Sequence, residues 1–290
     1  MPDHIIKATV PGIRAFAAVT TDLTEEARAR HDCFPIATAA LGRTMTAALL
    51  LAANLKTEES ITIRIAGDGI IGEIVADANA YGQVRGYVRN PKIDLPLKSG
   101  KLDVGGAVGN GFIYVTRFTG LKHPFTGSAP LVSGEIAEDI TQYLLVSEQT
   151  PSSVGLGVLV GPELNVLAAG GFLIQALPDA NEEDISLLEQ NLAQLPPVSQ
   201  LVAEGLDAKG IIQRIFTGMP INFFDQQPVA FQCQCSTDRI TKVLISLGEQ
   251  ELTEMIDEGQ AEVVCHFCSE KYHFTREQLN VILQKIQEEK

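Results

Sequence analysis

The chain has 290 residues, of which 45% are hydrophobic, enough for a sizeable core and one or two smaller units. It carries 36 Asp and Glu against 22 Lys and Arg, a formal net charge of -14. Because an acidic surface repels phosphate backbones and favours solubility, we expect no nucleic-acid partner.

The N-terminal residues carry charged side chains throughout, without the uninterrupted apolar run and small-residue cleavage site of a secretory signal. The most apolar stretch, Thr44 to Leu55, is too short to span a bilayer and is typical of a buried helix. We therefore expect a soluble cytoplasmic protein that contacts no membrane.

Residues 1–178 are predicted to form one core domain. Its strand candidates are short, rich in β-branched residues and bounded by Gly, Asn or Asp. They are Ile61–Ala66, Gly72–Asp77, Val84–Arg89, Phe112–Phe118, Leu156–Val160 and Val166–Ala169. Helices are predicted over Thr38–Asn54, apolar all round and therefore buried, and over Ile136–Ser147, which is amphipathic. Strands mostly follow one another, which indicates an α+β fold with mainly antiparallel sheets.

Two glycine-rich stretches of this domain, Gly105–Gly111 and Gly155–Gly161, lack the spacing of nucleotide-binding loops. We interpret them as turns between strands. The carboxylates Asp77, Glu135, Glu138 and Asp139 show no acid–base or metal-ligand spacing and are expected to be surface charge.

Residues 179–230 are predicted to form a metastable helical linker. Ile185, Leu188 and Leu192 fall on one helical face, and Ile211, Ile212 and Ile215 mark a further short helix. Proline and glycine interrupt the segment repeatedly, and helices this short are unstable alone. The linker therefore needs a surface to pack on.

Residues 231–290 are predicted to form a small third unit. It contains a Cys-x-Cys loop, helices from about Thr237 and over Glu249–Glu258, and a short strand, Glu262–Val264. A final helix follows Thr275, with Gln278 three residues later in a capping-box pattern.

Four of the five cysteines lie in this last unit, as Cys233-Gln234-Cys235 and Cys265-His266-Phe267-Cys268. Tetrahedral zinc takes four thiolates at about 2.3 Å, and each motif would supply two of them. The sequence therefore predicts one Zn²⁺ bound by Cys233, Cys235, Cys265 and Cys268. One interpretation is purely structural, since a tail of this size needs a metal to fold.

The other interpretation adds reactivity, because thiolates are what peroxide and hypochlorous acid attack. Structural zinc contributes on the order of 10–16 kcal/mol to small zinc folds. Such a small core alone supplies about 3–5 kcal/mol. Oxidation of the ligands would therefore unfold the tail, and the linker would lose its docking partner.

The sequence also resembles the redox-regulated heat-shock holdase family, the thirty-three-kilodalton chaperonins. The resemblance covers essentially the whole chain, and its most specific part is the pair of cysteine motifs. The matching stretches are Tyr143–Val160, Ala168–Pro178, Phe231–Ser236, Leu247-Gly248, Glu251-Leu252, Glu262–Cys268 and Tyr272–Phe274.

The resemblance implies an ATP-independent chaperone, not an enzyme, that is inactive in its reduced, zinc-bound form. Oxidation is implied to form the disulfides Cys233–Cys235 and Cys265–Cys268, release zinc and unfold the tail and linker. A homodimer that binds unfolded client proteins and prevents their aggregation is implied to result.

Two other function classes remain as alternatives. A thiol oxidoreductase would use Cys265 and Cys268 catalytically, but such a motif should open a helix, and here an extended segment follows. A nucleic-acid-binding zinc module should be basic, whereas residues 231–290 carry eleven acidic and six basic side chains, a net charge of -5.

Several residues have weaker predictions. His266 and His273 are expected to be structural or solvent-facing, the alternative being that one of them replaces a cysteine ligand. Cys33 is expected to be an inert thiol, the alternative being glutathionylation. Client binding is predicted to involve apolar linker residues and the sheet surface beneath them. These residues are Ile185, Leu188, Leu192, Ile211 and Ile215.

Overall fold

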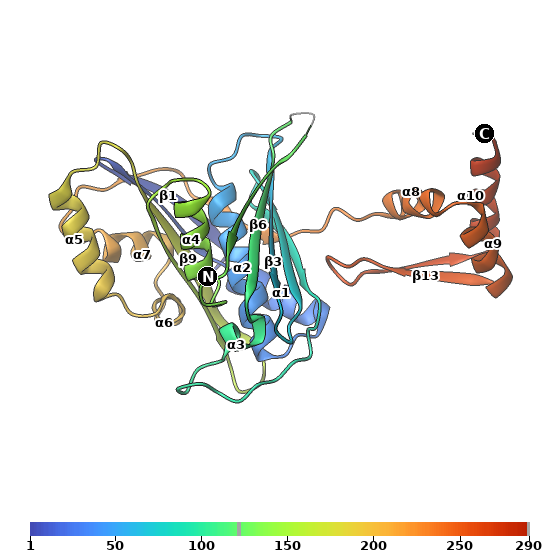
Figure 1. Cartoon of the computed structure of the whole chain (residues 1–290), viewed down its shortest axis with the longest axis horizontal. Helices are drawn as coiled ribbons and strands as arrows, with labels where there is room; N and C mark the ends of the chain where they lie inside the picture. The colour runs from blue at the N-terminus through green and yellow to red at the C-terminus, as the bar shows by residue number, and fades with distance from the viewer. Residues whose placement is uncertain (121–122, 289–290) are drawn as a thin grey trace. The chain divides into compact units, whose positions relative to one another are not determined.

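A computed structural model describes residues 1–120 and 123–288 of the chain (Figure 1). It separates into two compact units, Met1–Gln232 and Cys233–Lys290. The last two residues of the predicted 231–290 unit lie outside the described part. The division into 1–178, 179–230 and 231–290 stays a prediction, since the two units say nothing about which segment is metastable.

The first unit contains two layers of strands. The strands are β1 (His4–Val10), β2 (Ile13–Val19), β3 (Ser60–Gly67), β4 (Glu73–Asn79), β5 (Gln83–Val88), β6 (Gly111–Phe118), β7 (Phe125–Pro130), β8 (Ser152–Val160), β9 (Val166–Ala176), β10 (Asn222–Phe223), β11 (Gln227–Pro228) and β12 (Ala230–Phe231). The helices are α1 (Thr21–His31), α2 (Pro35–Ala52), α3 (Val104–Val108), α4 (Ala137–Val146), α5 (Glu182–Ala193), α6 (Val198–Ala203) and α7 (Ala208–Ile215).

One sheet has the strand order β10-β1-β2-β9-β8, with β11 also paired to β1, and the other has the order β12-β5-β4-β3-β6-β7. We call them the first and the second sheet. Their pairings are antiparallel except that of β12 with β5, which is parallel. The predicted α+β class with mainly antiparallel sheets is confirmed.

Helix α2 packs against strands of both sheets and forms the centre of the core (Figure 1). Every residue of this helix except Pro35 and Arg43 is buried, as its Ala- and Leu-rich sequence predicted. Arg43 pairs with Glu135 at 2.6 Å. Among the described residues, α2 alone has the length and hydropathy of a membrane span, but 89% of it is buried inside the protein. It is therefore a core helix.

Helices α5, α6 and α7 cover the first sheet, with their apolar faces packed on β1, β2 and β9 (Figure 1). Asn181 and Asp207 cap α5 and α7, each accepting a hydrogen bond from a backbone N–H three residues later. The backbone N–H of Ala208 donates to His4 Nε2 of β1 at 3.2 Å. The predicted helices of this segment are confirmed.

Gly157 explains how closely α6 approaches the sheet. It pairs directly with Gly170 across β8 and β9, so neither strand presents a side chain there. A Cβ on Gly157 would lie 2.5 Å from the backbone nitrogen of Ser199 in α6. The glycine in a strand therefore marks a close backbone contact, as strand glycines often do.

Three sequence-based expectations are wrong. Gly105–Val108 lies in helix α3, and Gly155–Val160 lies inside strand β8, so neither glycine-rich stretch is only a turn. Asp139 is fully buried and not surface charge. Its carboxylate accepts four backbone N–H groups, those of Val132, Ser133, Gly134 and Ile136. This carboxylate fixes the loop that leads into α4.

The second unit has the three helices and the first strand expected from its sequence, and the extended segment expected after Cys268 contains a second strand. They are α8 (Thr237–Leu247), α9 (Glu249–Glu258), β13 (Gln260–Val264), β14 (Lys271–Thr275) and α10 (Arg276–Glu288). Strands β13 and β14 form an antiparallel hairpin. The capping box of α10 is confirmed, since Thr275 N–H donates to Gln278 Oε1 and Gln278 N–H donates to Thr275 Oγ1.

Candidate metal centre

The four cysteines of the second unit come from two loops. Cys233 and Cys235 lie just before α8, whose first turn is capped by Ser236 through a hydrogen bond from the Arg239 N–H. Cys265 and Cys268 lie in the turn between β13 and β14. There the Cys265 carbonyl accepts the N–H groups of Cys268 and Ser269, at 3.4 and 2.8 Å. Local backbone bonding therefore sets the direction of both side-chain pairs.

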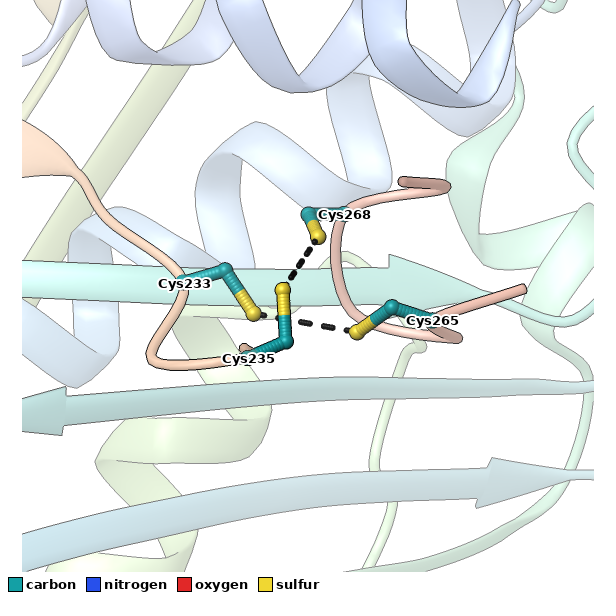
Figure 2. A group of neighbouring side chains, drawn as sticks. All are labelled: Cys233, Cys235, Cys265 and Cys268. Carbon is teal, nitrogen blue, oxygen red and sulfur yellow. Dashed lines mark hydrogen bonds between the residues drawn. The ribbon is translucent and has the colours of Figure 1, made fainter. Parts of the chain in front are cut away.

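The four sulfur atoms converge on one point, as Figure 2 shows, and all lie within 4.8 Å of one another. Cys233 Sγ is 3.8 Å from Cys265 Sγ, and Cys235 Sγ is 3.3 Å from Cys268 Sγ. A tetrahedron with metal–sulfur bonds of about 2.3 Å has sulfur–sulfur edges of about 3.8 Å, whereas a disulfide bond is about 2.05 Å. All five cysteines are free thiols. The spacing fits metal ligands better than disulfide partners.

The electrostatics of the cluster also fit a cation. Without one, burial raises the pKa of the Cys265 and Cys268 thiols. Four adjacent thiolates are stable only when a cation offsets their charge, and a bound metal ion deprotonates such thiols. The chemistry of the donor set therefore requires a soft metal ion for its ionised form.

Tyr272, on β14, also contacts the cluster. Its hydroxyl shares a hydrogen bond with the Cys235 sulfur, and this bond is the main cause that raises the Tyr272 pKa. Sequence reasoning missed this residue. Its place four residues after Cys268 carries no signal until the hairpin register is known.

The two histidines lie outside the cluster of four sulfurs. His273 is 70% exposed and lies 3.6 Å from Glu262. The Cys265–Cys268 motif lies in a hairpin turn and opens no helix, which disfavours a thioredoxin-like site.

Cys33 belongs to the first unit and is not one of the four clustered cysteines. It is 2% exposed, and burial raises the pKa of its thiol to about 12. A buried thiol that resists ionisation is a poor nucleophile, which agrees with the expected inert role, and that role stays a prediction.

The second unit has a small apolar core. Its buried members are Leu244, Leu252, Phe274, Leu279 and Ile282. They come from α8, α9, β14 and α10, and the partly buried Ala261 and Val263 of β13 pack against them, so all five elements of the unit meet at this cluster. A core of this size leaves the fold dependent on an additional cross-link, such as a bound metal ion.

Comparison with known proteins gives one consistent result. A family model described as Hsp33 protein matches residues 3–275. A 33 kDa chaperonin of Desulforamulus reducens is 52% identical over 99% of this chain and 99% of its own length. One from Bacillus velezensis is 50% identical over 96% of this chain and 97% of its own length. The crystal structure of a Thermotoga maritima 33 kDa chaperonin aligns with a TM-score of 0.92 and 37% identity, covering 98% of this chain and 99% of that one.

Proposed function

This chain belongs to the Hsp33 family of chaperones, and from that premise we propose that it is an ATP-independent holdase activated by oxidation of its four-cysteine centre. As a member of a chaperone family it binds unfolded client proteins. The observation that carries the redox part is the convergence of four free thiols in a unit with a small core.

In this proposal the ion is Zn²⁺, held by Cys233, Cys235, Cys265 and Cys268. The sulfur spacing and the all-thiolate donor set support this choice. When bound, zinc supplies a redox-inert tie between the two loops. Such a tie contributes on the order of 10–16 kcal/mol to folding.

The activating step is a two-electron oxidation by a peroxide. A thiolate sulfur attacks one peroxide oxygen, the O–O bond breaks, and a sulfenic acid and hydroxide form. The neighbouring thiol then forms the S–S bond and releases water. Repetition at the second motif removes all four ligands.

The family resemblance pairs Cys233 with Cys235 and Cys265 with Cys268. The sulfur distances do not select these pairs, since the sulfur contacts of 3.8 and 3.3 Å described above both run between the two motifs. The topology supports them for another reason. Each disulfide would then lie within one loop and leave the unit free to open, whereas cross-linked loops would hold it closed.

Loss of the tie is proposed to unfold the second unit and release the α5–α7 segment. The residues predicted to bind clients all pack against the first sheet in one apolar cluster. They are Ile185, Leu188, Leu192, Ile211 and Ile215. Their release would expose both the helices and the sheet surface, which is apolar surface of the kind that binds unfolded chains.

The remaining parts of the proposal concern partners and location. We infer that the active form is a homodimer in the cytoplasm, where reducing conditions keep the thiols free before stress. The proposal involves no nucleic acid, no membrane and no enzymatic turnover.

The test compares reduced and peroxide-treated protein at heat-shock temperature, with light scattering of an aggregating client as the readout. Bound zinc and free thiols are counted in the same samples. We expect suppression of aggregation only after about one zinc ion and four thiols per chain are lost. If the oxidised, zinc-free protein fails to suppress aggregation, the proposed redox activation is wrong and the metal site has a purely structural role.

Two variants serve as controls. Cys33→Ser should behave as the unmodified protein, because Cys33 is buried in the first unit and is not one of the four clustered thiols. Cys268→Ser should bind zinc weakly and suppress aggregation before oxidation.

A further inference from the structure

The stretch Asn222–Gln232, which we call the edge segment, completes an edge of both sheets. Its strands β10 and β11 pair with β1, and its strand β12 pairs with β5. Were the edge segment absent, β1 and β5 would each present an unpaired edge. Such edges are templates for another extended chain.

The attachment to the sheets is short. Each of β10, β11 and β12 is two residues long. On the first sheet, Phe224 N–H donates to the Lys7 carbonyl and Val229 N–H to the Asp3 carbonyl, at 3.0 and 3.2 Å. Most side chains of the segment are exposed or half-buried. Segments with few buried contacts open at low free-energy cost.

The end of the segment that lies on β5 has a well-defined seat. Ala230 N–H donates to the Gly82 carbonyl at 3.0 Å and Gln232 N–H to the Val84 carbonyl at 2.8 Å. Gly82 has a φ of +75°, and a Cβ on it would lie 2.5 Å from the Pro228 carbonyl oxygen. Only glycine lets the extended backbone lie this close.

Side chains enter this seat at every second position. Val229 and Phe231 are buried, while Ala230 between them is exposed. The Arg30 guanidinium lies over the Phe231 ring, 5.4 Å from its centroid. The seat therefore recognises extended backbone with apolar side chains two residues apart.

The edge segment is joined directly to the proposed switch. Gln232, whose side chain accepts a hydrogen bond from Gln83, precedes Cys233, the first candidate ligand. Unfolding of the second unit would leave the segment with a free-moving end at Gln232. Opening then begins at the β12 seat.

We propose that release of the edge segment uncovers the edges of β1 and β5, and that these edges bind an extended segment of an unfolded protein by strand addition. In this mode backbone hydrogen bonds give affinity and alternate side-chain positions give preference. An unfolded protein is the fitting occupant because it offers unpaired backbone and alternating apolar residues, which a folded protein keeps paired. The inference rests on the proposed function and adds a defined surface to it.

The test uses a fluorescent peptide with the sequence of residues 226–232, Gln-Gln-Pro-Val-Ala-Phe-Gln. In the full-length protein, Val229→Asp and Phe231→Asp together place carboxylates in buried positions and displace the edge segment without altering a cysteine. Fluorescence anisotropy should show peptide binding to this reduced, zinc-loaded variant. The unmodified protein should bind the peptide well only after oxidation. In its reduced form it should bind the peptide at least about thirty-fold more weakly than the variant does.

Two modified peptides separate strand addition from general apolar contact. N-methylation at Ala230 and Gln232 removes the donors to the Gly82 and Val84 carbonyls and should weaken binding about thirty-fold. N-methylation at Phe231, whose N–H points away from β5 in this register, should leave most of the affinity. Equal binding of both peptides overturns the proposal.

Competition identifies the occupant. A reduced, carboxymethylated protein that cannot fold should displace the peptide from both the variant and the oxidised protein. If peptide binding instead weakens as protein concentration rises, with dimers seen by sedimentation, a second copy takes the edge and the client assignment is wrong.

The two proposals fail separately. Suppose that the oxidised protein suppresses aggregation, but neither the oxidised protein nor the reduced double variant binds the peptide. That result overturns this inference and leaves the proposed function standing. Oxidised protein that does not suppress aggregation overturns the proposed function, while the reduced variant still tests the surface. If the double variant does not fold, the oxidised unmodified protein provides the same peptide comparison.

Discussion

The two units of the molecule are stabilised in different ways. The first has a central helix, α2, that is buried along almost its whole length and packs against strands of both sheets. The second has a cluster of five buried apolar side chains and four thiols within 4.8 Å of one another. The stability that apolar packing gives the first unit does not depend on the oxidation state of any group, so oxidation cannot switch it.

The difference teaches where a reversible response can be located in a protein. A large core resists local change, since unfolding it costs the packing of many side chains together. A small core held by thiolates depends on a few atoms whose bonding changes with oxidation. Under the proposed function the chain therefore combines a core that oxidation leaves intact with a small unit whose fold depends on its thiols, and this contrast can be tested by experiment.

The largest expected effect is that of metal removal. A strong chelator in reducing buffer should abolish the circular dichroism of α8, α9 and α10, because the metal contributes on the order of 10–16 kcal/mol. The first unit should keep a cooperative thermal transition. Amide protection that persists in residues 233–288 without metal would contradict the contrast.

A core substitution in the second unit should act through the metal. Leu252 is fully buried, so Leu252→Ala should lower the folding stability of the second unit by about 3 kcal/mol. Because zinc binds the folded unit, zinc affinity should fall about 100-fold. The matched control is Leu247→Ala, at a position 44% exposed, with an expected change within about 0.5 kcal/mol. Competition with a zinc indicator measures both. Equal affinities would mean that the core and the metal site fold independently.

The first unit has a pH-dependent weakness at Asp3. Burial raises the Asp3 pKa from 3.8 to about 6, although its carboxylate accepts the N–H groups of Asp22 and Leu23 at the start of α1. Because the folded state holds the proton more tightly, this group's stabilising contribution is complete below about pH 4 and is lost as pH rises through 6. The loss by neutral pH is about 3 kcal/mol.

The test of this weakness is Asp3→Asn, which cannot ionise. Urea unfolding of both proteins between pH 4 and 7.5 should show that the variant lacks this fall in stability. Parallel curves for the two proteins would show that Asp3 does not titrate in this range.

A smaller effect is expected in the helices that cover the first sheet. Asn181 caps α5 by accepting the Asp184 N–H at 2.7 Å. Asn181→Ala should cost about 1 kcal/mol and speed hydrogen exchange in α5 about five-fold, while Asn181→Ser keeps the cap. Identical exchange in the alanine and serine variants would show that packing alone holds the helix.

The smallest effect is expected for His273→Ala. The imidazole is exposed and lies outside the sulfur cluster, so zinc stoichiometry should be unchanged and stability altered by no more than about 0.5 kcal/mol. Elemental analysis of the purified variant measures the zinc. A loss of zinc would favour a centre of three cysteines and one histidine.

The sequence predicted best what local patterns decide. Strands such as β3 and β6 alternate β-branched residues with polar ones, and α2 is apolar on all sides. The cysteine motifs predicted the cluster, because ligand spacing is a local property. The sequence showed no comparable signal for β10, β11 and β12, since two-residue strands exist only through their partners on β1 and β5.

Two features that the sequence did not show depend on tertiary structure. Asp139 was expected at the surface, yet four backbone N–H groups make its burial favourable, and these come from a loop whose fold the carboxylate itself fixes. The contact of Tyr272 with Cys235 depends on hairpin register. Such contacts depend on tertiary structure and carry no sequence period.

The paired glycines beneath α6 have a consequence for the breadth of recognition. Where Gly157 faces Gly170, the sheet exposes peptide groups with no projecting side chain. Projecting side chains are what let a protein surface discriminate between sequences by shape. If α6 lifts away as proposed, the sheet surface beneath it is flat at this point and contacts many polypeptides equally well. The glycine pair that lets α6 pack closely in the resting state therefore also makes binding unselective in the open state.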